Sequence, residues 1–523
     1  MLLLPATSAF FIFISPQSYE GMNDDIVYVL NPDYILKNDT DKILLYSHRL
    51  VASYSQSNWI SFIHPVQAIL LSFFTYERTW RENLHLLARF LQKEESVVRN
   101  MLSPYLENPY PFHTEWKKTR IDFPSHILLN AERVKAGCAW SRRPIPVKEM
   151  ACSKVDLANP RIHTMPLHAT FMLTNRCVTR CKYCYADTAT LVEKEVSADR
   201  WLEVIDELVG LNVQDIHLIG GEIFLYKQWP VLLKKLVDTG YCPEIISTKY
   251  PVNEWIVGQL KSTGFTGRVQ ISLDSVSSET LQPLLQVGSG YWDKLKQGIL
   301  GLDRAAVPMK IATVLTTYNS SVEEMENLYR FIASLKHVES WSLCAAMNSL
   351  YQNKETLPFM KAKKEVLEEI YTFIETKLKP EAAFEISFNR GNMDREFYHG
   401  EEGSSSFKGP QCSALNSHIF VLPDGKVTIC EQLYWHPAYI IGDLSVQNVG
   451  EVWNSDRVHY LMNLPRKDVR EGSACKTCGL FEACIQQKNR CWVNVIKAYG
   501  EENWDYPDPR CKQAPPTYYP LNY

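Results

Sequence analysis

The sequence predicts an α/β protein with a central parallel sheet, a small winged-helix-like domain before it and a cysteine-rich domain after it. Strand and helix patterns alternate six times between residues 169 and 378, which is typical of parallel β–α units with right-handed crossovers. A hairpin signal followed by three amphipathic helical stretches indicates the N-terminal domain. Of the 14 cysteines, three lie close together after the first of these strands and seven lie beyond residue 411.

The N-terminal domain is expected to combine three strands with three helices. Strand patterns at Tyr34–Leu36 and Ile43–Tyr46 flank the polar turn NDTDK, and Trp59–Ile63 gives a third strand. Apolar residues at helical spacing then predict helices between residues 64 and 105. Thr79 and Glu82 form a capping-box pattern at the start of the second helix.

The apolar start, MLLLPATSAFFIFISP, is expected to be neither a signal peptide nor a membrane span. No basic residue precedes it and Pro5 interrupts it, and a span needs about 20 apolar residues. We expect Ser8–Ser15 to form a buried strand. The net charge of −4 gives no reason to expect binding to nucleic acid or to an anionic membrane. Closely spaced cysteines indicate metal binding in a reducing compartment, so we expect a cytoplasmic protein.

The central domain is expected at residues 166–390, between a bridge without clear periodicity at 111–165 and a cysteine-rich domain at 391–523; the N-terminal domain takes residues 1–110. The strands are expected at Ala169–Thr174, Val213–Ile219, Glu244–Thr248, Val269–Leu273, Lys310–Leu315 and Ser340–Ala345. The helices are expected at Trp201–Leu211, Trp229–Val237, Glu254–Ser262, Tyr291–Leu302, Val322–Leu335 and Phe359–Leu378.

The first cysteine group, Cys177, Cys181 and Cys184, has the spacing Cys-x3-Cys-x2-Cys in the loop TNRCVTRCKYCYAD. Three thiolates on one short loop suit a cluster of four irons and four sulfides, and they leave one iron open to bind a small molecule. Structural zinc is the alternative, but it wants four ligands, and the loop holds no fourth cysteine or histidine. The loop follows a strand at the end where β/α barrels place their active sites.

The motif CVTRCKYC resembles the signature of the radical S-adenosylmethionine (SAM) superfamily, and the units around it resemble that family's partial (β/α)6 barrel. The resemblance implies that the open iron chelates the amino and carboxylate groups of SAM. An electron from the cluster would then cleave SAM to a 5′-deoxyadenosyl radical, which abstracts a hydrogen atom from the substrate. The cofactor supplies this chemistry and the protein positions it.

Polar residues at three further strand ends match the family's SAM contacts. Glycines allow close backbone approach and a carboxylate can accept bonds from the SAM ammonium group, although Glu222 could instead be a charge at a helix start. A serine or aspartate at a strand end is also often a helix cap. The expected SAM-binding residues are Gly220, Gly221 and Glu222 of IGGE, Ser247 and Thr248 of ISTK, and Ser272 and Asp274 of SLD. No residue is assigned as the catalytic acid or base.

The second cysteine group resembles the SPASM extension, which holds two auxiliary four-iron clusters in peptide- and protein-modifying radical SAM enzymes. The resemblance implies a distal cluster on Cys475, Cys478, Cys484 and Cys511, and a nearer one on Cys412, Cys430 and Cys491. Six residues separate Cys484 from Cys491, where the family often has three. His418 or Asp424 could supply a fourth ligand to the nearer cluster. A zinc ribbon is the alternative, but seven cysteines do not divide into four-ligand sites. Three [4Fe–4S] clusters and SAM are therefore the expected cofactors.

The N-terminal pattern ISFIHPVQAILLSFF, TWRENLHLLARFL and SVVRNMLSPYL resembles the PqqD-like element that recognises precursor peptides. There a leader peptide adds a strand to a sheet edge. A DNA-binding winged helix would need a basic recognition helix, whereas the third helix carries Glu94 and Glu95. The resemblances together imply a maturase that closes a thioether or carbon–carbon cross-link in a precursor peptide, with a flavodoxin or ferredoxin as electron donor. The alternatives are an oxidase of the sulfatase-activating type and a non-catalytic iron–sulfur scaffold that binds peptide.

Overall fold

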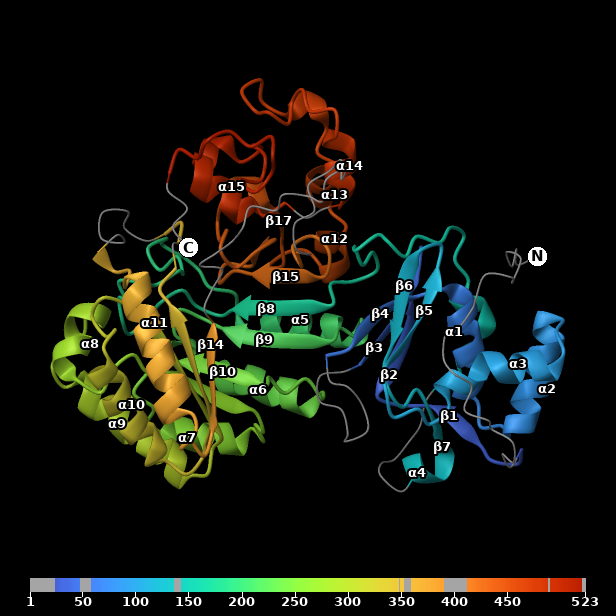
Figure 1. Cartoon of the computed structure of the whole chain (residues 1–523), viewed down its shortest axis with the longest axis horizontal. Coiled ribbons are helices and arrows are strands. Elements are labelled where there is room, and N and C mark those ends of the chain that lie inside the picture. The colour runs from blue at the N-terminus through green and yellow to red at the C-terminus, as the bar shows by residue number, and fades with distance from the viewer. Residues whose placement is uncertain are drawn as a thin grey trace. The chain divides into compact units, whose positions relative to one another are not determined.

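The computed structural model describes residues 24–47, 58–135, 143–347, 349–351, 359–389, 412–487 and 490–519. It divides the chain into two compact units, Met1–Thr164 and Met165–Tyr523, which are coloured blue to cyan and cyan to red in Figure 1. The strand expected at Ser8–Ser15 lies outside the described residues.

The first unit contains the predicted three-stranded antiparallel sheet. Its strands are β2 (Tyr34–Asn38), β3 (Ile43–Ser47) and β4 (Ile60–Ile63), in the order β2-β3-β4. Asn38 pairs with Ile43 across the turn, where the Asn38 side chain accepts a hydrogen bond from the Thr40 backbone. The hairpin predicted from the polar turn is confirmed.

Three helices follow the sheet as predicted. They are α1 (Pro65–Ser72), α2 (Trp80–Leu91) and α3 (Glu95–Leu102), with 3₁₀ turns at Phe73–Thr75 and Ser103–Tyr105. Thr79 and Glu82 form the predicted capping box, in which each side chain accepts a bond from the backbone N–H of the other. Trp80 is fully buried at the centre of the apolar core that these helices share with β3.

Residues 111–164 belong to the first unit, which revises the expected bridge at 111–165. Strands β5 (Phe112–Trp116) and β6 (Thr119–Phe123) form a hairpin, and β7 (Leu128–Asn130) pairs with β1 (Tyr28–Leu30). The segment ends in α4 (Ala131–Lys135) and a 3₁₀ turn at Val147–Met150. The hairpin turn consists of two lysines, Lys117 and Lys118, both with positive φ. Such turns usually carry Asn or Gly, so this hairpin had no turn signal in the sequence.

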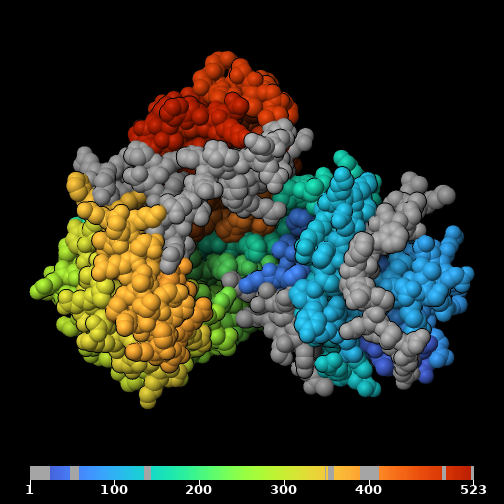
Figure 2. All heavy atoms as spheres, viewed as in Figure 1, coloured from blue at the N-terminus to red at the C-terminus, as the bar shows by residue number. Residues whose placement is uncertain are grey.

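The second unit contains a five-stranded parallel sheet in the order β10-β11-β12-β13-β14. The predicted strands and helices of this region are confirmed, except that the helix expected from Phe359 begins at Lys364. The prediction omitted β14 and α8. The strands are β10 (Ile245–Thr248), β11 (Arg268–Ser272), β12 (Met309–Leu315), β13 (Val338–Ala345) and β14 (Glu385–Asn389). The helices are α7 (Glu254–Ser262), α8 (Ser278–Leu285), α9 (Tyr291–Arg304), α10 (Val322–Ala333) and α11 (Lys364–Phe373), which continues as a π turn to Leu378. Side chains of α10 and α11, yellow to light orange in Figure 2, form part of the surface of the second unit in this view.

A second sheet joins the first two predicted strands of the central domain to strands of the cysteine-rich domain, so the six predicted strands are divided between two sheets. Strands β8 (His168–Met172) and β9 (Asp215–Ile219) are parallel, and β15 (His418–Val421) pairs in parallel with the other edge of β8. β16 (Lys426–Thr428) and β17 (Ile440–Asp443) complete the order β17-β16-β15-β8-β9. Helices α5 (Ala198–Gly210) and α6 (Trp229–Asp238) follow β8 and β9 in the chain. β15 and β16 form a hairpin around Gly425, which has φ of 92°.

Short helices make up the rest of the C-terminal region. They are α12 (Val449–Trp453), α13 (Asp456–Met462), α14 (Phe481–Gln487) and α15 (Trp492–Tyr499). Tyr439, Trp492 and Trp504 contact one another through their rings at centroid distances of 5.5 to 6.1 Å. In the part of the chain that the structure describes, no helix has both the length and the apolar character needed to cross a membrane.

Candidate functional site

The first cysteine loop begins where β8 ends and is held by backbone bonds to α8. The N–H groups of Arg180 and Lys182 donate to the carbonyl groups of Leu285 and Leu284. The hydroxyl of Thr179 lies 3.5 Å from the Cys177 sulfur and 3.2 Å from the Cys181 sulfur, so these two thiols face a common space. Burial raises the pKa of Cys184, and the neighbouring Cys177 raises it further. The three predicted ligands therefore converge.

The glycine pair of IGGE supports this loop directly. The Gly221 N–H donates to the Thr174 carbonyl at 2.7 Å, and the Glu222 N–H donates to the Arg176 carbonyl at 2.8 Å. A Cβ atom at Gly221 would lie 2.5 Å from the carbonyl oxygens of Asn175 and Arg176, far inside van der Waals contact. One at Gly220 would lie 3.1 Å from the Thr174 carbonyl. In this structure the close backbone approach is thus between the β9 loop and the start of the cysteine loop.

Glu222 is buried between the ends of β9 and β10. Its carboxylate accepts hydrogen bonds from the Thr248 hydroxyl at 2.8 Å and from the Lys249 backbone at 3.1 Å. Burial raises the pKa of Glu222 to about 7, against the opposing effect of these hydrogen bonds. Two expected SAM contacts, Glu222 and Thr248, are therefore hydrogen-bonded to each other.

Asp274 is fully buried and connects the cysteine loop to two strand ends. Its Oδ2 accepts from Lys249 Nζ at 2.7 Å and from the Tyr183 hydroxyl at 2.5 Å. Its Oδ1 accepts from the Val314 N–H at 3.0 Å. Because Tyr183 lies between Cys181 and Cys184 in the chain, its hydrogen bond to Asp274 fixes the position of the cysteine loop.

Lys249 and Tyr183 are site residues that the sequence reasoning missed. Lys249 is the last residue of the quoted ISTK motif, and its position directly after a buried strand was the available signal. Its Nζ also bonds the Ser272 carbonyl at 3.0 Å. Ser247 differs from the other expected contacts: it is exposed and accepts a bond from Gln270. Neighbouring strand residues point to opposite faces, so Ser247 and Thr248 lie on different sides of β10.

Further contacts fix the same loop to the ends of β12 and β13. Lys182 Nζ donates to the Tyr318 hydroxyl at 2.6 Å, and the Ser349 hydroxyl donates to the Tyr185 carbonyl at 2.8 Å. The loop is thus held by residues that follow four successive strands of the sheet, from β10 to β13. This arrangement positions three thiols rigidly at the carboxyl ends of the parallel strands.

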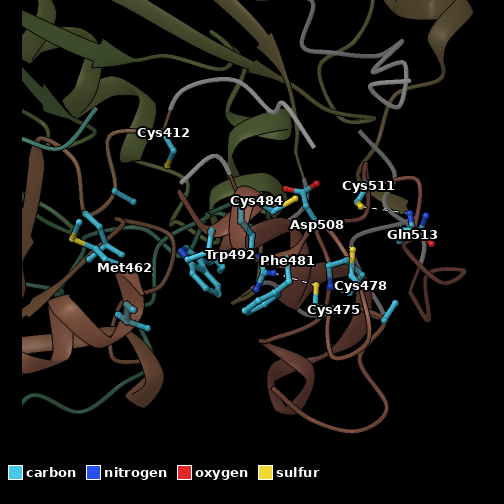
Figure 3. A pocket seen from close by; sticks show the side chains of 17 residues that line it. Cys412, Met462, Cys475, Cys478, Phe481, Cys484, Trp492, Asp508, Cys511 and Gln513 are labelled. Atoms are coloured by element: carbon cyan, nitrogen blue, oxygen red, sulfur yellow. Dashed lines mark hydrogen bonds between the residues drawn. The ribbon is translucent and has the colours of Figure 1, made fainter. Parts of the chain in front are cut away.

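Five cysteines of the second group line one pocket in the C-terminal region. We call Cys475, Cys478, Cys484 and Cys511 the four-thiol group; all four line this pocket (Figure 3). Burial raises the pKa of Cys511, and the other three thiols raise it further. These are the four ligands expected for the distal cluster, and the structure brings them together.

The remaining three cysteines form a second set, which we call the three-thiol group: Cys412, Cys430 and Cys491. Burial raises the pKa of Cys430 to about 12, with Cys412 and Cys491 contributing through their proximity. Cys412 also lines the far side of the pocket in Figure 3. The Cys491 N–H donates to Asp508 at 2.9 Å, which orients the start of α15.

The two side chains considered as a fourth ligand for the three-thiol group have other partners. His418 Nε2 lies 2.9 Å from the Thr170 hydroxyl on β8, and burial lowers the pKa of His418 to about 4. Asp424 accepts from the Trp435 indole at 2.9 Å and pairs with Lys426 at 3.2 Å. The three thiols of the first cysteine loop and those of the three-thiol group each fit a four-iron cluster with one open iron. The four-thiol group fits a four-iron cluster in which every iron has a protein ligand.

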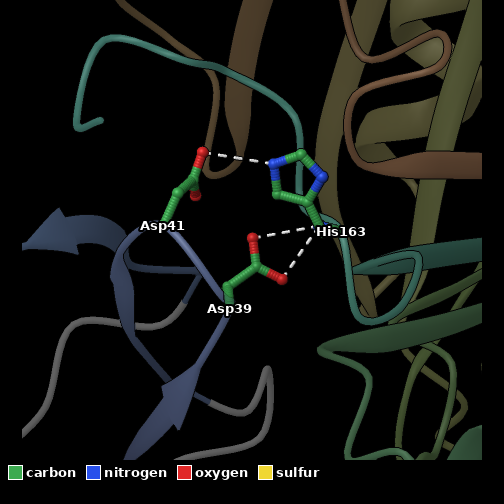
Figure 4. Close-up of side chains that lie close together, drawn as sticks. All are labelled: Asp39, Asp41 and His163. Carbon is green, nitrogen blue, oxygen red and sulfur yellow. Dashed lines mark hydrogen bonds and ion pairs between the residues drawn. The ribbon is translucent and has the colours of Figure 1, made fainter. Parts of the chain in front are cut away.

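A different cluster of potential ligands, Asp39, Asp41 and His163, lies in the first unit (Figure 4). The ammonium group of the fully buried Lys42 supplies the positive charge here, because its Nζ lies 2.7 Å from Asp41 and 3.7 Å from Asp39. Asp39 also accepts bonds from the backbone N–H groups of His163 and Thr164. We interpret this cluster as an ion-paired anchor for the end of the first unit, not as a metal site.

Comparison with known proteins gives two family matches that coincide with the cysteine groups. Residues 171–332 match the radical SAM superfamily. Residues 412–479 match the SPASM iron–sulfur cluster-binding domain. The first match contains the whole first cysteine loop, and the second contains Cys412, Cys430, Cys475 and Cys478.

The similar proteins include one named as a maturation protein and one named as a peptide cyclase. The sporulation killing factor maturation protein SkfB of Bacillus subtilis is 22% identical over 258 residues, which are 48% of this chain and 55% of that protein. The PqqA peptide cyclase of Granulibacter bethesdensis is 27% identical over 32% of this chain and 43% of that protein. The chain thus spans about half the length of the curated relatives it matches.

A solved structure shares the fold over most of the chain. The Streptococcus suis protein SuiB, in its complex with S-adenosylmethionine, aligns with a TM-score of 0.57 and 16% identity, over 92% of this chain and all of that one. SuiB has also been solved with its precursor peptide SuiA. The converging thiols and the two family matches agree: residues 171–332 match the radical SAM superfamily, and residues 412–479 match the SPASM iron–sulfur cluster-binding domain.

Proposed function

We propose that this protein is an enzyme that modifies a ribosomally made precursor peptide and closes a cross-link in it. The observation that carries the proposal is the presence of both cysteine regions in one compact unit. The β15–β8 ladder connects the auxiliary region to the strand that leads into the first cysteine loop. The relatives named as a maturation protein and a peptide cyclase support a peptide substrate.

The first cysteine loop would hold a four-iron cluster whose open iron binds SAM. When bound, this pair supplies a 5′-deoxyadenosyl radical. The protein's own part is to keep the loop in place: Asp274 fixes Tyr183 and Lys249, and Gly221 lets the β9 loop approach the backbone that precedes Cys177. The SAM contacts proposed from the family pattern are Gly220, Gly221, Glu222, Ser247, Thr248, Ser272 and Asp274. Of these, Ser247 has the weakest structural support because it is exposed on β10.

The second region would hold two more four-iron clusters, which makes three in all. The three-thiol group leaves one iron open, as the first loop does, and a substrate thiolate is a fitting soft ligand for iron. We therefore favour a thioether over a carbon–carbon cross-link. A flavodoxin or ferredoxin would supply the electron for SAM cleavage. Such clusters need reduced thiols, which the cytoplasm provides.

The first unit would bind the leader part of the precursor. β4 pairs with β3 and also lies against β6. Among the described residues, β2 at the other end of the order β2-β3-β4 has no strand partner beyond β3, so we propose that the leader adds a strand at the edge of β2. The PqqD-like sequence pattern coincides with β4 and the three helices after it. An oxidase of the sulfatase-activating type would not need such a leader-binding domain.

The experiment that tests the proposal replaces Cys177, Cys181 and Cys184 together by Ala. After anaerobic reconstitution the parent protein should hold about twelve irons, and the variant about four fewer. The variant should form no 5′-deoxyadenosine from SAM. Cys242→Ala is the control, because Cys242 belongs to neither group and should change neither value. Stoichiometric zinc without cluster absorption in the parent protein would end the proposal.

A further inference from the structure

Arg490 contacts the four-thiol group with its side chain and adjoins the three-thiol group in the chain. Its Nη2 donates a hydrogen bond to the Cys475 sulfur at 3.3 Å, the bond drawn to Cys475 in Figure 3. Its backbone directly precedes Cys491. The guanidinium group also lies 5.1 Å from the ring centre of Trp492, and both side chains line the pocket of the four-thiol group.

The charge of Arg490 differs from that of the other arginines near this pocket. Arg510 is paired with Asp508 at 2.7 Å, and Arg466 is paired with Glu482 at 2.6 Å. Within the described ranges, Arg490 forms no ion pair with a carboxylate, and its buried Nη1 has no hydrogen-bond partner. Arg490 therefore brings an uncompensated positive charge to the Cys475 sulfur.

On the basis of the proposed function, we propose that Arg490 raises the reduction potential of the four-thiol cluster above that of the three-thiol cluster. Hydrogen bonds to the sulfurs and nearby charge are two of the factors that set such potentials. The reduced cluster carries one more negative charge than the oxidised one, so a fixed cation stabilises it more. One electron would then pass from the reduced three-thiol cluster, which becomes oxidised, to the four-thiol cluster, which becomes reduced. No bond or proton changes in this step.

The test uses the full chain with Cys177, Cys181 and Cys184 replaced by Ala, so that only the two auxiliary clusters remain. Potentiometric titration followed by electron paramagnetic resonance gives both midpoints. The signal lost in an added Cys478→Ala/Cys484→Ala change, which leaves only two of the four thiols, belongs to the four-thiol cluster. At a fixed potential, Arg490→Gln should lower the ratio of reduced to oxidised four-thiol cluster about tenfold, which for one electron is about 59 mV. The three-thiol cluster should shift less.

Arg466→Gln is the matched control. Arg466 donates to the Cys478 carbonyl at 2.8 Å but its charge is neutralised by Glu482, so its replacement should shift the midpoint much less. An unchanged midpoint in Arg490→Gln, or an equal shift in Arg466→Gln, would overturn the inference. If Arg490→Gln loses the cluster, Arg490→Met decides, because it also removes the positive charge and a midpoint equal to the parent's would overturn the inference. An iron content well below about eight in the parent background would instead refute the auxiliary clusters themselves.

Discussion

At the scale of single residues, a buried ion pair determines where the first cysteine loop lies. The Asp274 side chain is fully buried and the Lys249 side chain is only 12% exposed. Interaction with Asp274 and the nearby thiols raises the pKa of Lys249, although burial alone would lower it. The same carboxylate accepts the Tyr183 hydroxyl, so the charge pair and the loop depend on each other.

Asp274→Asn should therefore destabilise the second unit. The change leaves the Lys249 ammonium group buried without its counter-charge, which costs about 3–5 kcal/mol in comparable buried pairs. Urea unfolding should show the loss, and SAM cleavage should fall with it because the loop moves. The double variant Asp274→Asn/Lys249→Met removes the lone charge and should regain part of the stability. If it is as unstable as the single variant, the hydrogen bonds of Asp274 matter more than its charge.

The sequence predicted the cysteines of this site, but not all of the residues that hold the cysteine loop in place. Spacing alone identified Cys177, Cys181 and Cys184, because ligands on one loop are close together in any fold. The contact between Lys249 and Asp274 joins residues from two different strands, and no local pattern encodes such a pair. For the same reason, Arg490 was not found before its distance to Cys475 was known.

At the scale of elements, the β9 loop and the first cysteine loop are joined by backbone hydrogen bonds and by a bond from the Arg176 side chain to the Leu225 carbonyl. Periodicity predicted the strands on both sides, since buried strands and amphipathic helices leave a clear pattern. It missed β14 and α8 because β14 (Glu385–Asn389) has polar residues on its exposed face and α8 contains Pro283, which usually argues against a helix. The β5–β6 hairpin was missed because its turn has two lysines at positive φ.

Gly221→Ala should displace the β9 loop from the cysteine loop. The new Cβ would meet two carbonyl oxygens at 2.5 Å, so the backbone must separate there. We expect the reconstituted variant to lose about four of about twelve irons, those of the first loop, and to keep the auxiliary ones. Gly258→Ala is the control because no atom lies within 4 Å of its Cβ position in α7. It should keep all the iron and gain up to about 1 kcal/mol in stability from better helix propensity. Equal iron in both variants would contradict the close approach.

At the scale of the whole molecule, the chain consists of two units whose boundary falls at residue 164, not at residue 110. Three contacts show that residues 111–164 belong to the first unit. β7 is the partner strand of β1, Phe112 and Phe123 stack at 5.0 Å within its core, and Asp39 accepts backbone bonds from His163. The sequence analysis placed the start of the central domain at residue 166, close to this boundary. It could not indicate that residues 111–164 belong to the first unit, because that depends on pairing between strands about 100 residues apart.

Residues 1–164 expressed alone should therefore fold and bind the leader peptide, whereas residues 1–110 should not fold. The shorter fragment lacks β7, the partner of β1, so apolar residues of β1 such as Leu30 become exposed. It also lacks residues 163 and 164, whose backbone N–H groups bond to Asp39. Circular dichroism during heating should show a cooperative transition only for the longer fragment. Calorimetry with a candidate precursor peptide from a neighbouring reading frame should then give the same affinity for residues 1–164 as for the full chain. A folded 1–164 fragment that does not bind the peptide would show that the unit is structural, and leader recognition would have to lie in the second unit.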